Sequence, residues 1–102
     1  MTKTQKDLCK HIADHYSTNT RLGVFQEEAA EMIVAISKVN RELPDAEKKY
    51  VEALADLSIM VEEQVSRMDE DERVEYYMKI NEKLNKRMDI IKSEQADGLS
   101  EV

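Results

Sequence analysis

The chain has 102 residues, the size of one domain, and 41% of them are apolar while 36% are charged. With two Gly, one Pro, one Phe and no Trp, the composition is typical of helical bundles and argues against a sheet protein. The formal net charge of -7 repels phosphate backbones and anionic lipid head groups, so we expect binding neither to nucleic acid nor to a membrane.

Cysteine usage and the N-terminus indicate the compartment. Cys9 is the single cysteine, which excludes an internal disulfide and fits a reducing environment. His11 and His15 lie near it without a further ligand, so a zinc site is not expected. The N-terminal "MTKTQKDLCK" has no apolar signal core, and no apolar run approaches the roughly 20 residues needed to cross a bilayer. We therefore expect a cytoplasmic protein.

Apolar periodicity first predicts a helix over about 4–15, with Leu8, Ile12 and His15 at helical spacing. The following "STNT" favours a turn and an N-cap, so a second helix is expected from about Thr20. Its apolar stripe is formed by Leu22, Phe25, Ala29, Ile33, Ile36 and Val39. The opposite side is also largely apolar or small, which indicates packing on more than one side and predicts a homodimer or homotetramer.

Pro44, in "NRELPDAEKK", should end the second helix and allow a third from about 46 to 68. The third helix has an apolar stripe at Val51, Leu54, Ser58, Val61, Val65 and Met68. Asp69 with Glu72 forms a capping-box pattern that predicts a fourth helix. Its heptad-like seam is Val74, Tyr77, Asn81, Leu84, Met88 and Ile91. Such seams are more often bundle core than coiled coil, and Asn81 suits a register-setting residue better than a ligand.

We therefore predict an all-α fold with one four-helix domain over 1–95 and a frayed tail over 96–102.

Three acids lie in the second predicted helix, within "VFQEEAAEMIVAI". Glu28 and Glu31 are three positions apart and project side by side, with Glu27 at the edge of the same face. A carboxylate in apolar surroundings must find a cation, find donors or take up a proton. Glu31 is the only charged residue from 29 to 36. Hard oxygen ligands at this spacing suit Mg²⁺ or Mn²⁺.

The third helix supplies further acids. Glu52 and Asp56 are four positions apart, and Glu63 lies near the azimuth of Asp56 two turns on. If the second and third helices pack antiparallel, these acids can face Glu28 and Glu31 and form a divalent-metal cup. The alternative is a solvated face, because the three acids lie opposite the main apolar stripe of their helix.

The two acidic segments resemble a known family. "EEAAE" at 27–31 and "EALAD" at 52–56 are similar to the EExxE and ExxD motifs of the MazG-like all-α nucleoside triphosphate pyrophosphohydrolases, in particular small phage-type members. The resemblance is strongest from His11 to Gln64. It implies a four-helix MazG-like bundle with helix pairs packed through an oligomer interface.

The resemblance also implies an activity, which is Mg²⁺-dependent hydrolysis of a (d)NTP to (d)NMP and pyrophosphate. This activity would remove unwanted nucleotides from the cellular nucleotide pool. Glu28, Glu31 and Asp56 would be the metal ligands, and Glu27 would position water or make an additional metal contact. Where the family has an acid, this chain has Ala53, and Glu52 is the candidate replacement. No motif identifies the base.

The alternative to an enzyme is a catalytically weakened or non-catalytic helical oligomer with a binding, structural or regulatory role, which the heptad seams and Ala53 favour. Basic residues allow two interpretations as well. Lys38, Arg41 and the bases of the fourth helix can steer phosphates, or they can belong to solvated faces. The bases of the fourth helix are Lys79, Lys83, Lys86, Arg87 and Lys92.

Overall fold

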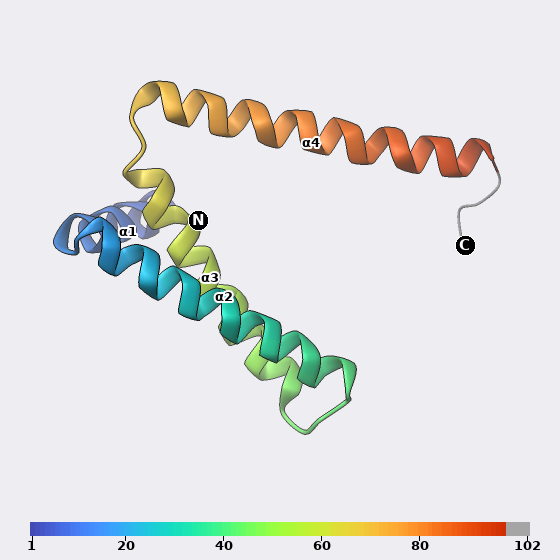
Figure 1. The fold of residues 1–102 in the computed structure, drawn as a ribbon, viewed down its shortest axis with the longest axis horizontal. Coiled ribbons are helices and arrows are strands. Elements are labelled where there is room, and N and C mark those ends of the chain that lie inside the picture. The colour runs from blue at the N-terminus through green and yellow to red at the C-terminus, as the bar shows by residue number, and fades with distance from the viewer. Residues whose placement is uncertain (98–102) are drawn as a thin grey trace. The chain divides into compact units, whose positions relative to one another are not determined.

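The computed structural model describes residues 1–97, which form four α-helices and no strand (Figure 1). The helices are α1 (Lys3–His15), α2 (Thr18–Asn40), α3 (Ala46–Ser66) and α4 (Glu70–Ala96). The predicted all-α fold with four helices is confirmed for these residues. Of the predicted tail over 96–102, Ala96 ends α4, and the part from 98 onward lies outside the described residues.

The chain divides into two compact units, and each is described by itself. The first, Met1–Arg67, contains α1, α2 and α3, while the second begins at Met68 and contains α4. Among residues 1–97, none of the helices combines the length and the apolar character that a membrane span requires.

Side-chain caps explain where three helices begin. Thr2 and Gln5 form a capping box at α1, and Asp69 and Glu72 form the predicted capping box at α4. Ser17 caps α2 by accepting a hydrogen bond from the Thr20 main-chain N–H at 3.2 Å. Because Ser17 is the cap, α2 begins two residues before the predicted Thr20.

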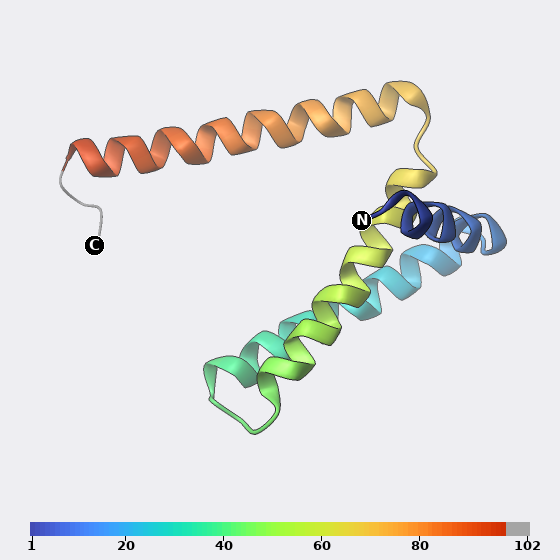
Figure 2. The same cartoon turned by 180° about the vertical axis from the view of Figure 1, so that it is seen from behind.

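A short turn over 41–45 joins α2 to α3, and the two helices run antiparallel and side by side (Figures 1 and 2). Pro44 lies in this turn, as predicted. Glu42 and Asp45 adopt left-handed backbone conformations, with φ of 54° and 58°. Each left-handed non-glycine residue costs about 1 kcal/mol, so helix packing must compensate for the turn.

The core of the first unit is built from small side chains. Its buried apolar residues are Cys9, Ala13, Met32, Ala35, Ala46, Ala53 and Val65. Met32, Ala35 and Ala53 form one cluster between α2 and α3, with Tyr50 and Leu57 packed against it. Small residues let helix backbones approach closely, so α2 and α3 meet along an alanine-lined face.

This packing corrects the predicted core faces. Ile33 is 69% exposed and Val51 is 62% exposed, although both belong to the predicted apolar stripes. In α1, Cys9 and Ala13 are buried, while Leu8 and Ile12 are exposed. The prediction weighted residues by hydrophobicity, whereas close helix contact selected small residues and left several bulky apolar side chains outside.

Arg21 ties the beginning of α2 to the end of α1. It is buried, and its Nη1 donates to the main-chain carbonyls of Ala13 at 2.9 Å and Tyr16 at 2.8 Å. Glu63 of α3 is also buried, at 2% exposure. Burial raises the pKa of Glu63, and the charge of Arg21 opposes this rise. The solvated face considered for Glu63 is therefore wrong.

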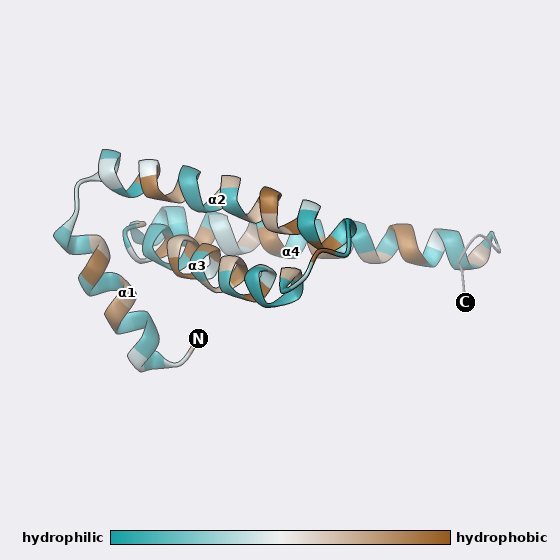
Figure 3. Cartoon of the chain, turned by 90° about the horizontal axis from the view of Figure 1, so that it is seen from below, coloured by the Kyte–Doolittle hydropathy of each residue, from teal (hydrophilic) through white to brown (hydrophobic). Residues whose placement is uncertain are grey.

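In α4, no residue from Glu70 to Ala96 is buried. Apolar and polar residues alternate along the helix (Figure 3). The apolar seam residues are between 43% and 55% exposed, and they are Val74, Tyr77, Leu84, Met88 and Ile91.

Candidate metal centre

Three carboxylates from two helices converge in the first unit. Glu28 and Glu31 come from α2 and Asp56 comes from α3, and one oxygen of each lies within 4.8 Å of the others. The two α2 acids are neighbours because i and i+3 share a helix face, and the antiparallel turn brings Asp56 opposite them. The structure thus brings together the three acids that the resemblance implied as ligands.

Electrostatics at this cluster disfavours a full set of negative charges. Partial burial raises the pKa of Glu28 above its usual range, and the charges of Glu31 and Asp56 raise it further. The Oε2 atom of Glu28 is buried and has no hydrogen-bond partner. Among residues 1–97, none of the three carboxylates takes part in an ion pair. A divalent cation would satisfy both the unpartnered oxygen and the mutual repulsion, so the residues fit Mg²⁺ or Mn²⁺.

The predicted apolar surroundings of Glu31 are corrected by the structure. Glu31 and Asp56 are exposed, and Glu28 is the half-buried member of the cluster. The bulky residues after Glu31 in the chain, such as Ile33 and Val34, are themselves exposed and do not enclose it. A cation at this cluster could therefore exchange with solvent without an opening of the helices.

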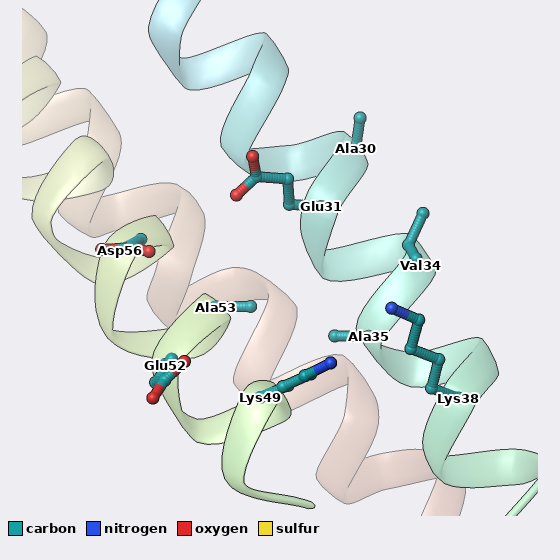
Figure 4. A pocket seen from close by; sticks show the side chains of 9 residues that line it. All are labelled: Ala30, Glu31, Val34, Ala35, Lys38, Lys49, Glu52, Ala53 and Asp56. Carbon is teal, nitrogen blue, oxygen red and sulfur yellow. The ribbon is translucent and has the colours of Figure 1, made fainter. Parts of the chain in front are cut away.

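An open groove of about 390 Å³ continues from the cluster between α2 and α3 (Figure 4). Glu31 and Asp56 line it and thereby join the groove to the cluster. Lys38 of α2 and Lys49 of α3 line the groove as well. The groove therefore combines carboxylates with two amines, which suits a ligand that carries both a metal ion and several anionic oxygens.

The remaining acids have different positions. Glu52 lines the groove but does not belong to the group of oxygens within 4.8 Å. Glu27 is exposed and also lies outside this group, although its charge contributes to the raised pKa of Glu28. Glu63 is buried near Arg21, outside the cluster. Of the acids predicted to face one another, Glu28, Glu31 and Asp56 lie together, Glu52 lies on the groove beside them, and Glu63 lies elsewhere.

Ala53 lies where the resembling family has an acid. Its side chain is 7% exposed and belongs to the cluster with Met32 and Ala35. Ala35 and Ala53 point toward each other across the helix contact (Figure 4). A methyl group at position 53 therefore supports the close approach of α2 and α3.

Sequence reasoning named Lys38 but missed Lys49. Lys49 is seven positions from Asp56, two turns away on the same helix face, so helical spacing could have found it. Arg41 does not line the groove, and the bases of α4 belong to the second unit.

No protein-family model matches this chain, and neither a curated protein nor a solved structure matches it. The proposed function therefore depends on the chemistry of the cluster and on the resemblance of the two acidic segments.

Proposed function

We propose that this protein is a Mg²⁺-dependent nucleoside triphosphate pyrophosphohydrolase, which converts a (d)NTP and water to (d)NMP and pyrophosphate. The observation that carries the proposal is the convergence of Glu28, Glu31 and Asp56 at one end of a groove that also holds Lys38 and Lys49. A triphosphate carries several negative charges and needs cations along its length. Carboxylates alone would repel it, whereas a carboxylate-bound divalent ion together with two amines would not.

Each group has a proposed role. Glu28, Glu31 and Asp56 would hold Mg²⁺, which would offset the charge of the phosphate oxygens and make the phosphorus more electrophilic. Lys38 and Lys49 donate hydrogen bonds to phosphate oxygens and hold the triphosphate along the groove. Glu27 or Glu52 orients water and accepts its proton. Water forms a bond to the α-phosphorus, the bond from that phosphorus to the bridging oxygen breaks, and pyrophosphate leaves with the bond electrons.

A second candidate function is binding without turnover, in a homo-oligomer with a structural or regulatory role. It is favoured by Ala53, because the position where the family has an acid is occupied by a methyl group within the helix contact. In that case Glu52 would not replace the missing acid, and the cluster would bind a metal nucleotide complex without hydrolysing it. Several bulky apolar residues of α2 and α3 remain exposed, which also favours self-association.

The test is pyrophosphate release from a panel of nucleoside triphosphates with Mg²⁺, with Glu31→Gln beside the wild type. We expect the wild type to release pyrophosphate and Glu31→Gln to lose at least a hundredfold in kcat/KM. The matched control is Glu75→Gln on α4, which removes one exposed carboxylate outside the cluster. Full activity of Glu31→Gln would refute the site. Calorimetric binding of a Mg²⁺ nucleotide by the wild type without pyrophosphate release would select the second function.

A further inference from the structure

We propose that α4 pairs with α4 of a second copy in antiparallel orientation, so that the seam of this helix is the contact between two chains. This inference goes beyond the proposed function and does not depend on it. The seam is a stripe of alternating three- and four-residue spacing at Val74, Tyr77, Asn81, Leu84, Met88 and Ile91.

The seam is long enough for a specific contact. It extends over 17 residue steps, or about 26 Å of helix. Its apolar side chains are about half exposed, including Val74 at 54% and Leu84 at 55%. Met78 and Ile80 flank it and widen the apolar surface. A heptad seam of this kind packs its side chains between those of a facing helix.

Charge distribution identifies a second copy as the occupant. From 70 to 82 the helix has five acids and two bases, whereas from 83 to 96 it has four bases and two acids. A helix with an acidic first half and a basic second half is complementary to itself in the antiparallel orientation only. In this orientation the acidic half of each helix lies beside the basic half of the other copy.

The antiparallel register also gives every seam residue a partner. Val74 faces Ile91 of the second copy, Tyr77 faces Met88, and Asn81 faces Leu84, with each pair repeated by symmetry. In this register the described helix overlaps its copy along its whole length. Beside the seam, Arg73 lies opposite Glu94 of the second copy, which is an attractive pair.

The parallel orientation has one favourable feature, because Asn81 would then face Asn81 of the second copy. It would, however, place Arg87 beside Lys92 of the second copy on both flanks and the two acidic first turns beside each other. These like-charge contacts outnumber the single amide pair. The charges of α4 therefore favour the antiparallel pair.

The first experiment is sedimentation equilibrium of the full chain at micromolar concentration, with Leu84→Glu and the matched control Ile90→Glu. Ile90 is 50% exposed, is of similar size and lies on α4 outside the seam, so its substitution introduces the same charge without entering the contact. We expect the wild type and Ile90→Glu to associate, and Leu84→Glu to have half the wild-type mass with unchanged helical circular dichroism. A monomeric wild type, or association that Leu84→Glu leaves intact, would overturn the proposal.

The second experiment tests the orientation of the two helices with spin labels. The labels are introduced into Cys9→Ala protein, after sedimentation equilibrium has shown that this variant associates as the wild type does. A label at Asp71→Cys should lie about 35 Å along the axis from its copy, whereas one at Glu82→Cys should lie within a helix diameter of its copy. A parallel pair would place both labels about 10 Å from their copies. A short distance at position 71 would overturn the antiparallel assignment.

Discussion

Replacing Glu28 with Gln removes one charge from the carboxylate cluster while preserving the shape of the side chain. The oxygens of Glu28, Glu31 and Asp56 lie within 4.8 Å of one another, a distance at which two unit charges repel by about 0.9 kcal/mol in bulk water. Two such pairs involve Glu28, and salt screens part of their repulsion because the cluster is largely exposed. We therefore expect Glu28→Gln to stabilise the metal-free protein by roughly 1 kcal/mol at pH 7, or about 4 to 8 °C in Tm.

The raised pKa of Glu28 determines how the stability difference between the wild type and Glu28→Gln changes with pH. Because partial burial and neighbouring acids raise the pKa of Glu28, the folded protein keeps this proton to a higher pH than the unfolded chain does. Stability of the metal-free wild type should fall as the pH rises from the usual glutamate range to the raised pKa, and stay low above it. Because the glutamine side chain does not titrate, the stability of Glu28→Gln should not show the part of this decline that Glu28 causes. Below about pH 4.5 the two proteins should be equally stable.

Urea unfolding followed by circular dichroism measures the effect, with a chelator and then with millimolar Mn²⁺. Mn²⁺ should stabilise the wild type by mass action and reverse the order of the two proteins, because Glu28→Gln has lost a ligand. Glu75→Gln is the control and should follow the wild type in both conditions. Equal stability of Glu28→Gln and wild type at pH 7 in chelator, together with equal stabilisation by Mn²⁺, would refute the carboxylate cluster.

Four further predictions concern the groove and the core. Asp56→Asn should abolish pyrophosphate release with unchanged circular dichroism, whereas Glu52→Gln should lose activity only if Glu52 serves in place of the missing acid; both are read from initial rates. Lys38→Ala and Lys49→Ala should each raise KM about tenfold, because each removes one cation from the phosphate groove, and Lys79→Ala on α4 should leave KM unchanged. Ala53→Glu should lower the free energy of unfolding by about 2 kcal/mol in chelator, since it places a carboxylate against Met32 and Ala35; an unchanged urea midpoint would contradict this packing. Arg21→Ala should cost about 3 kcal/mol, because it removes two bonds to main-chain carbonyls and the positive charge that opposes the rise in the pKa of buried Glu63, and Arg21→Lys should recover only part of this loss in the same assay.

Helix positions were the part of the fold that local sequence signals predicted well. Pro44 and the Asp69–Glu72 capping box act within one helical turn, so their effect does not depend on distant residues. The capping-prone segment "STNT" also indicated the second helix, but Ser17 is its N-cap and the helix begins two residues before the predicted Thr20. Helical spacing and a short antiparallel turn predicted that acids of the two helices would meet, but they included Glu52 and Glu63, which lie outside the cluster. The set of Glu28, Glu31 and Asp56 was implied by the family resemblance.

The buried faces were predicted poorly, because burial depends on which helix faces meet. Alanines at 35 and 53 gave a weak hydrophobic signal but permit close approach, whereas Ile33 and Val51 gave a strong signal and are exposed. The burial of Glu63 was missed for a related reason. Arg21, whose charge opposes the rise in the pKa of Glu63, is 42 positions away in the chain, and no local pattern joins the two residues.

The short turn between α2 and α3 also bears on the order of folding. Every residue of the carboxylate cluster and of its groove belongs to this one helical hairpin, so the contacts that form the site are local in sequence. Local contacts require little loop-closure entropy and form early, on the microsecond to millisecond scale typical of helical domains. Glu42→Gly, which relieves a left-handed backbone in the turn, should therefore mainly change the folding rate if the hairpin is part of the transition state, and mainly the unfolding rate if it forms later.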